Sequence, residues 1–245
     1  EFAKKEKIKY LEEFYSISYA KLKYYDRYVA YSNETGEDEE ITVLYVNLGM
    51  DGEAYVDPTL VDEFDVTMLV NKYFRVEEDF IPNYLSDVPE DYAGDSGIQA
   101  SKLAIDAFIE MADAAEKEGL GIVINSGYRS YQDQIDIAEY YKKWYGQGYV
   151  DKYVAKPGFS EHQTGLAYDI GSRSVNVFAN SKEYEWMKNN AYKYGFIERF
   201  TKKYENITGF RQETWHYRYV GKDIAKYIHE NNISFEEYFA VYLDK

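Results

Sequence analysis

Apolar residues recur at helical spacing in the middle of the chain. They follow the pattern i, i+3, i+4, i+7 at Ala100, Leu103, Ala104, Ala107, Phe108, Met111 and Ala115. This spacing places their side chains along one side of an α-helix. Gly119 follows, and glycine readily takes the left-handed conformation that ends many helices. The pattern therefore predicts a core-facing helix that stops at Gly119.

A second helical pattern lies near the N-terminus. It predicts an amphipathic helix that continues irregularly toward residue 31 and whose apolar positions are Ile8, Leu11, Tyr15, Tyr19 and Leu22. The next segment, 32–40, is polar and strongly acidic, which predicts a solvated loop. Residues 41–48 return to apolar and β-branched side chains, and the pattern leaves the type of that element open.

Capping residues and glycines mark further helix boundaries. A side chain that accepts from the first turn, answered by an acidic residue three positions later, is typical of a helix start. The predicted starts are Ser130 with Asp133, Asn180 with Glu183, Gly221, and Ser234 with Glu237. The helix that begins after Asn180 runs to about residue 194, where Gly195 stops it.

Short apolar runs predict strands between these helices. They cover 66–70, 120–124, 167–170, 196–200 and the segment around residue 216, with 167–170 as a central strand. Prolines and glycines predict a long loop over 82–97, a flexible approach over 146–159 and a turn at 206–209. The late strands lie close together in sequence. This order favours an α+β fold, with helices packed on a small antiparallel sheet.

We expect the chain to have two parts. Residues 1–65 are expected to form an N-terminal helical, accessory segment, and residues 66–245 the main domain. With 245 residues and 45% hydrophobic content, the chain can bury a substantial core. Tyrosine occurs 29 times. For most of these side chains, half-buried packing is favoured over stacking on carbohydrate.

Charge and cysteine content restrict which binding partners and which metal sites the chain can have. The formal net charge of −16 argues against nucleic acid, whose phosphates would be repelled, and against anionic lipid surfaces. The chain has no cysteine, which excludes disulfides and thiolate metal sites but does not decide the compartment. No apolar run is long enough to predict a membrane helix, and no signal peptide is seen. Because the sequence begins abruptly at Glu1, we expect that an export signal or anchor was trimmed.

Candidate chemistry concentrates in the segment 160–169, S-E-H-Q-T-G-L-A-Y-D. His162 and Asp169 offer an imidazole and a carboxylate, both good ligands for a divalent ion such as zinc, and Gly165 lets the backbone turn tightly between them. His216 lies in a second motif and offers a third ligand. A single histidine beside aromatic residues is more often a packed core residue. Here two of only three histidines fall in such motifs, while His229 lies in a polar helical tail.

Three motifs together resemble the VanY-type D-alanyl-D-alanine carboxypeptidases. They are S-G-Y-R-S at 126–130, S-x-H-x-x-G-x-A-x-D at 160–169 and W-H-Y-R-Y-V-G at 215–221, in the family's order. The same group of zinc peptidases includes VanX dipeptidases, LdcB-type L,D-carboxypeptidases and, more distantly, the Hedgehog fold. The likeness extends from about residue 66 to the C-terminus and identifies 66–245 as a zinc carboxypeptidase domain.

The resemblance implies a role for each matching residue. Zn²⁺ is held by His162, Asp169 and His216, and Glu213 is the general base. Three zinc ligands with an open fourth position lower the pKa of a bound water to about 7. Simple strand alternation points Glu213 and His216 to opposite faces, so Glu213 has to lie in a turn or bulge before the strand.

The resemblance also implies a substrate site beside these groups. Arg129 stands at a strand-to-helix junction, and its planar guanidinium matches the terminal carboxylate of a peptide. Gln134 and Ser160 add hydrogen bonds there.

The resulting prediction is a zinc-dependent D,D-carboxypeptidase that removes the terminal D-alanine from peptidoglycan stem peptides. Two alternatives stay open: an L,D-carboxypeptidase acting on tetrapeptide stems, and a non-catalytic metal-containing binding module. The expected partners are stem peptides or their precursors. We expect a monomer at the external face of a Gram-positive cell, in contact with the membrane only through a missing N-terminal anchor.

Overall fold

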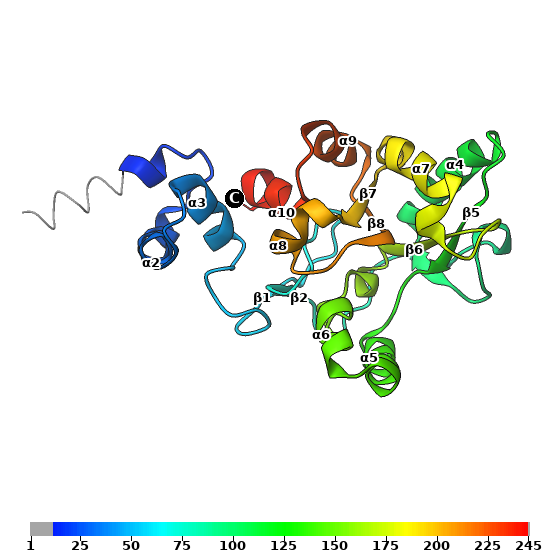
Figure 1. The fold of residues 1–245 in the computed structure, drawn as a ribbon, viewed down its shortest axis with the longest axis horizontal. Coiled ribbons are helices and arrows are strands. Elements are labelled where there is room, and N and C mark those ends of the chain that lie inside the picture. Colours follow the sequence, from blue (N-terminus) through cyan, green and yellow to red (C-terminus); the bar gives the residue numbers. More distant parts are fainter. Residues whose placement is uncertain (1–11, 245) are drawn as a thin grey trace, which may run out of the picture.

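The computed structural model describes residues 12–244, and a four-stranded antiparallel sheet lies at its centre (Figure 1). The strand order is β5-β6-β8-β7. The strands are β5 (Ile122–Ser126), β6 (Ala167–Ser172), β7 (Phe196–Phe200) and β8 (Glu213–Tyr219). The predicted α+β fold with a small antiparallel sheet is confirmed, and β6 is a central strand as expected.

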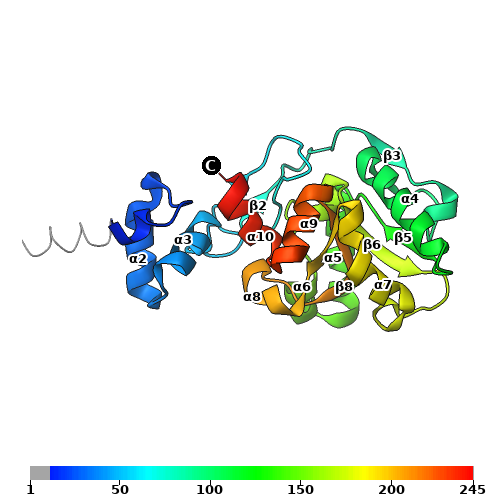
Figure 2. The same ribbon diagram turned by 90° about the horizontal axis from the view of Figure 1, so that it is seen from above.

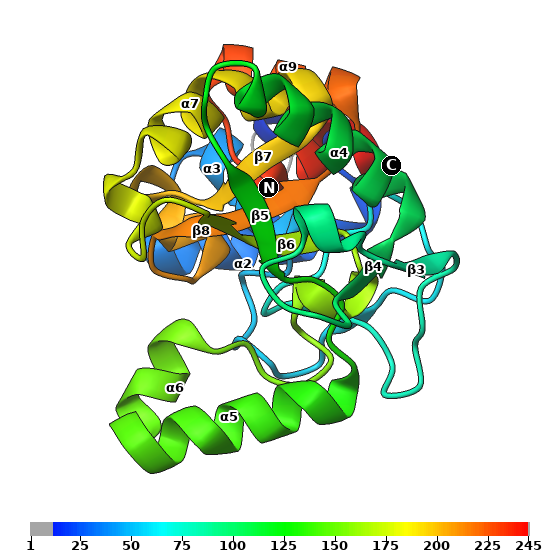
Figure 3. The ribbon, with the colours of Figure 1, turned by 90° about the vertical axis from the view of Figure 1, so that its right-hand side faces the viewer.

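Helices lie before, between and after the strands of this sheet in the sequence, and two short two-stranded sheets precede it. The helices are α2 (Tyr25–Thr35), α3 (Glu39–Asn47), α4 (Lys102–Glu116), α5 (Tyr131–Tyr145), α6 (Gln147–Tyr153), α7 (Lys182–Asn190), α8 (Glu205–Thr208), α9 (Lys222–Asn231) and α10 (Phe235–Tyr238). The short strands are β1 (Thr59–Leu60), β2 (Phe74–Arg75), β3 (Leu85–Asp87) and β4 (Gln99–Ser101). Helices α5 and α6 lie beside each other, apart from α4, α7 and α9 (Figure 3).

One face of the sheet forms the main hydrophobic core. Phe108 of α4 is fully buried, and its ring lies 6.0 Å from that of Tyr168 and 6.3 Å from that of Phe196. Ile170 and Tyr217 belong to the same cluster. Because side chains alternate along a strand, the residues between these positions point to the opposite face. That opposite face carries the polar residues described below.

The N-terminal helices pack around a separate cluster at one end of the molecule (Figure 2). Its buried members are Phe14, Tyr25, Tyr28, Val43 and Val46. The C-terminal end of the chain lies close by, where Lys21 pairs with Asp244. Strand β1 pairs in parallel with β2, so backbone contacts cross the predicted boundary at residue 65. Within residues 12–244, no helix has the length and apolar character needed to span a bilayer.

Several local predictions are confirmed. Ser130 and Asp133 form a reciprocal capping box at the start of α5, and Ser234 and Glu237 form another at α10. Helix α4 ends shortly before Gly119, which has a φ of +77°. The stop at Gly195 is also found, with a φ of +90°.

Other local predictions are wrong. Residues 66–70 form no strand, because Arg218 takes the carbonyls of Val66 and Met68 that a neighbouring strand would otherwise need. The cap of α7 is Ser181 and not Asn180, since the Ser181 hydroxyl accepts from the amide of Tyr184.

The segments predicted as loops contain regular structure. The approach 146–159 holds α6, the turn at 206–209 is largely the single-turn helix α8, and the loop over 82–97 contains β3. Helix α2 extends to Thr35, inside the predicted loop 32–40. Residues 41–48 lie mostly in α3, which Asp38 caps by accepting from the amide of Ile41.

The predicted N-terminal helix begins among residues that lie outside the described part. Within the described part it is interrupted over 16–21, where the Ser16 hydroxyl donates to the carbonyl of Glu13. A serine hydroxyl that bonds to the carbonyl of a preceding residue competes with continued helix.

Candidate metal centre and cleft

Three residues that offer metal ligands meet on the polar face of the sheet. Asp169 of β6 is paired in register with His216 of β8, so both side chains point the same way from adjacent strands. His162 approaches from a 3₁₀ turn over Glu161–Thr164. Asp169 Oδ1 lies 3.3 Å from His162 Nε2 and 3.4 Å from His216 Nδ1. One ligand atom from each residue lies within 4.8 Å of the others, which is the spacing of a shared metal ion.

Each imidazole is oriented by a partner on its far side. His162 Nδ1 lies 2.7 Å from the carbonyl oxygen of Gly127, and because a carbonyl can only accept, this nitrogen carries the proton. His216 Nε2 lies 3.2 Å from Glu161 Oε2 in the same manner. The lone pairs of His162 Nε2 and His216 Nδ1 therefore face the shared centre. This arrangement is the usual one for histidines that bind metals.

Two glycines make this approach possible. Gly165 has a φ of +67° directly after the turn that carries His162. A Cβ on Gly127 would lie 2.3 Å from the carbonyl oxygen of Gln99, so only glycine fits where the backbone supports His162. The predicted tight turn at Gly165 is confirmed.

Glu161 is a site residue that the sequence analysis missed. Its carboxylate is 2.8 Å from Arg199 Nε and 3.1 Å from Arg218 NH1, and Arg199 also pairs with Glu236 of α10. All of these side chains are buried. The cluster ties β7, β8 and α10 to the residue that orients His216. Its one sequence signal is that Glu161 directly precedes a ligand histidine.

The pKa values of the two histidines are shifted in opposite directions because their neighbours differ. Burial and the Arg129 guanidinium lower the pKa of His162 to about 4, which keeps this imidazole neutral. Burial acts in the same direction on His216, but hydrogen bonds to Asp169 and Glu161 outweigh it and raise the pKa to about 9. Burial opposes ionisation of Asp169, yet His162 and Arg129 hold its pKa well below the usual range.

Glu213 reaches the centre through an irregularity at the start of β8. Glu198 pairs with Tyr217 and Phe200 pairs with Glu213, so β8 advances four residues where β7 advances two. The extra residues bring Glu213 Oε2 to 3.7 Å from His216 Nδ1. The expected bulge, which lets both side chains face the same way, is therefore present. Burial raises the pKa of Glu213 to about 7.

Arg129 lies directly beside the ligands. Its NH2 donates to Asp169 Oδ2 at 2.7 Å and lies 2.5 Å from His162 Nε2, while NH1 donates to Gln134 Oε1 at 3.3 Å. Gln134 is buried and also donates to the carbonyl of Ala155. Ser160 is buried in the wall of the same cleft. The structure therefore brings all the candidate site residues predicted from the sequence into one cleft.

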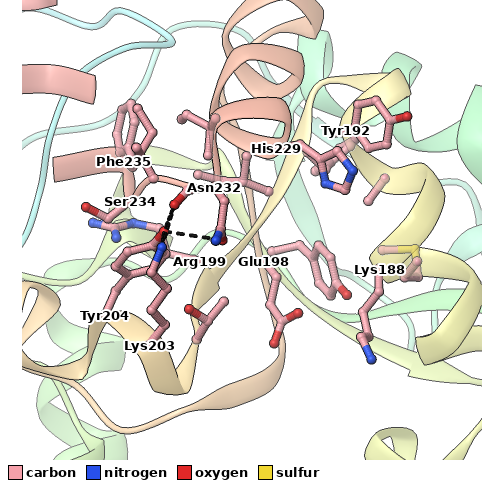
Figure 4. A pocket seen from close by; sticks show the side chains of 18 residues that line it. Lys188, Tyr192, Glu198, Arg199, Lys203, Tyr204, His229, Asn232, Ser234 and Phe235 are labelled. Carbon is pink, nitrogen blue, oxygen red and sulfur yellow. Dashed lines mark hydrogen bonds between the residues drawn. The ribbon is translucent and has the colours of Figure 1, made fainter. Parts of the chain in front are cut away.

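These groups line a cleft of about 190 Å³. Phe200 and Phe210 form part of one wall, and three tyrosines of α5 and α6 contribute to the rim. A second hollow, of about 310 Å³, is lined by residues of β7 and by the C-terminal residues 228–235 (Figure 4). His229 lines it and stacks on Tyr192 at 3.9 Å, away from the two ligand histidines. The candidate metal ligands therefore lie in the smaller of these two hollows.

Comparison with known proteins agrees with this geometry. A family model described as VanY, D-alanyl-D-alanine carboxypeptidase, matches residues 97–222, slightly more than half of the chain. The chain belongs to the VanY family of carboxypeptidases. It is 41% identical over 189 residues to a putative carboxypeptidase, YodJ, of Bacillus subtilis, covering 74% of this chain and 69% of that protein. It is 38% identical over 138 residues to a D-alanyl-D-alanine carboxypeptidase of Enterococcus faecalis, covering 53% of this chain but only 51% of that enzyme.

Solved structures extend the likeness to the fold. An LdcB LD-carboxypeptidase superposes with a TM-score of 0.69 at 38% identity, over 77% of this chain and 92% of that chain. A variant of a VanY D,D-pentapeptidase in complex with Zn(II) superposes with a TM-score of 0.61 at 31% identity, over 71% of this chain and 98% of that chain. Both neighbours are zinc-peptidase folds of the predicted kind. The family and enzyme class predicted from the motifs are thus confirmed.

Proposed function

We propose that this protein is a zinc-dependent D,D-carboxypeptidase that removes the terminal D-alanine from peptidoglycan stem peptides. The observation that carries the proposal is the triad His162, Asp169 and His216, with both imidazoles oriented and Glu213 next to them. Two imidazole nitrogens and a carboxylate form a donor set that suits zinc. The Zn(II) complex of the VanY relative supports the same ion.

Each chain residue has a distinct part in the reaction. Zinc, when bound, supplies a Lewis acid that activates water and polarises the scissile carbonyl. Glu213 accepts the proton of the attacking water and passes it to the leaving amine, for which a carboxyl with a raised pKa is suited. Glu161 and the Gly127 carbonyl keep the two imidazoles in place.

Arg129 is assigned to the terminal carboxylate of the substrate. It contacts the same lone pair of His162 that the ion needs, so the guanidinium has to turn away from the ligands when the ion is bound. Gln134 and Ser160 lie in the cleft that it then faces. A fork of two parallel hydrogen bonds would read a free C-terminus and make the enzyme an exopeptidase.

The Arg129 assignment predicts that Arg129→Lys is costly, because an ammonium cannot reproduce the fork. Amidating the substrate's C-terminus should reduce kcat/KM of the unaltered enzyme by a similar factor. Combining both changes should add little, since they remove one shared interaction. Cleavage of the amidated peptide as fast as the free acid would indicate an endopeptidase that cuts within cross-linked peptides.

An L,D-carboxypeptidase is the second candidate, and the LdcB likeness specifically favours it. The two activities differ by one stereocentre next to the scissile bond. Incubation of the zinc-loaded protein with defined tetrapeptide and pentapeptide muropeptides, followed by mass measurement, distinguishes them. Loss of D-alanine from the pentapeptide supports the D,D activity, whereas loss from the tetrapeptide alone supports the L,D activity. A non-catalytic binding module would cleave neither, and the presence of both Glu213 and Arg129 argues against it.

The site of action follows from the substrate. We place the protein at the outer face of a Gram-positive cell, as a monomer, with 66–245 as the catalytic domain and 1–65 as an accessory segment. Fractionation of the native cells, together with sedimentation of the purified protein, tests these assignments.

A further inference from the structure

The hairpin of α5 and α6 carries an exposed group of aromatic side chains beside the cleft. The exposed fractions are 58% for Tyr140, 64% for Trp144, 63% for Tyr145 and 40% for Tyr153. Tyr141 and Tyr149 lie between them. We call these six residues the aromatic ladder. Exposed aromatic groups of this size mark binding surfaces in soluble proteins.

The rings of the aromatic ladder form a continuous series. Tyr149 stacks on Tyr145 at 4.9 Å and lies 4.8 Å from Tyr153, and Tyr141 lies 5.5 Å from Tyr149. Tyr140 links Tyr141, at 5.6 Å, to Trp144, at 6.4 Å. The six rings therefore form one connected surface along the hairpin.

The main cores do not use these rings. The buried clusters of residues 12–244 include none of the six side chains. From 139 to 153 the only aliphatic side chain is Val150, whereas a groove for an apolar protein helix is normally rich in leucine, isoleucine or methionine. Three lysines and two acidic residues share the segment, so it is locally basic in a chain of net charge −16. That overall charge disfavours an anionic lipid surface.

The aromatic ladder is continuous with the catalytic cleft. Tyr141, Tyr149 and Tyr153 line the cleft that holds the metal ligands, while Trp144 and Tyr145 lie further out. Tyr145 stacks at 4.9 Å on Tyr149, which lines the cleft, so the outer rings and the cleft wall form one continuous surface.

We propose that the aromatic ladder binds the sugar chain of assembled peptidoglycan while the attached stem peptide enters the cleft. A sugar ring has a flat face of C–H groups and a polar edge, which match the face of an aromatic ring and the hydroxyls and lysines around it. This inference rests on the proposed function, because it makes glycan-linked stems, and not free peptides, the preferred substrate.

The test compares Trp144→Ala and the double variant Trp144→Ala/Tyr145→Ala with the unaltered protein. Hydrolysis of a free stem peptide should be unchanged, whereas kcat/KM for the same peptide on polymeric glycan should fall roughly 2- to 10-fold per ring. Trp144→Tyr, which keeps an aromatic ring, should retain most of the kcat/KM for the polymeric substrate. Tyr84→Ala removes an aromatic side chain that is 80% exposed and lies outside the hairpin, and it serves as the matched control.

A binding measurement separates this inference from the catalytic proposal. Peptide-free glycan strands should co-sediment with the unaltered protein and less with Trp144→Ala, whether or not any peptide is cleaved. No co-sedimentation, together with unchanged hydrolysis of the polymer by the double variant, would overturn the inference. Binding to phosphatidylglycerol vesicles or self-association that depends on Trp144, without glycan binding, would also overturn it and assign the surface to a membrane or a second copy.

Discussion

The two faces of the four-stranded sheet differ completely in chemistry although they share the same strands. Tyr168 and Tyr217 pack into the apolar core with α4, whereas their neighbours Asp169 and His216 belong to the candidate metal centre. A shift of one residue in register would exchange these roles. The apolar face fixes the register, and the register brings Asp169 beside His216. Stability on one face thus sets the geometry of chemistry on the other.

Removing a ligand should have the largest effect on chemistry. His216→Ala takes away one of three donors, so zinc content should fall from about one per chain to near zero and hydrolysis should be lost. Elemental analysis and a product assay check both. His229→Ala is the matched control, because His229 stacks on Tyr192 outside the cleft and its loss should leave zinc in place. A His216→Ala protein with full zinc and activity would remove the assignment.

Removing the base should slow turnover without releasing the ion. Glu213→Gln keeps the shape and hydrogen bonding but cannot accept a proton, so kcat should fall by roughly 10²- to 10⁴-fold with zinc retained. Glu198→Gln alters a partly buried carboxylate on the neighbouring strand β7 and should leave kcat nearly unchanged. Joint loss of zinc and activity in Glu213→Gln would make Glu213 a ligand or a structural residue.

Removing the hydrogen bond that orients His216 should reduce zinc affinity less than removing a ligand does. Glu161→Gln removes the charge that orients His216, and zinc affinity should fall by about 10- to 100-fold. Glu236→Gln removes a carboxylate that pairs with Arg199 but does not touch His216, so it should lower the free energy of unfolding while zinc affinity stays. Equal weakening of zinc binding by both variants would show that the whole cluster, and not the contact to His216, sets the affinity.

A change on the apolar face should have the smallest effect on chemistry. Phe108→Ala removes a ring that contacts Tyr168 and Phe196, which should cost about 3–5 kcal/mol of the free energy of unfolding. Denaturant titration measures this cost. The folded fraction should keep its zinc and its kcat. Zinc loss from folded protein would mean that the two faces are coupled more tightly than register alone requires.

The sequence by itself determined the features that depend on neighbouring residues. The capping boxes at Ser130 and Ser234 and the turn at Gly165 were predicted, because each needs partners only three or four positions away. The candidate ligands were predicted for a related reason: His162 and Asp169 share one short motif, and the second motif supplies His216. Strand alternation also predicted that a turn or bulge is needed at Glu213, and the register shift between β7 and β8 provides it.

Only the tertiary structure decided the contacts between distant segments. Arg218 holds the carbonyls of Val66 and Met68 from about 150 positions away, which turns a predicted strand into irregular chain. Glu161 meets Arg199 and Arg218 at separations of 38 and 57 residues, so no local pattern reveals that it orients a ligand. Local hydrogen bonds are fixed by the residues that make them, whereas a buried charge finds its partners only when the whole sheet has formed.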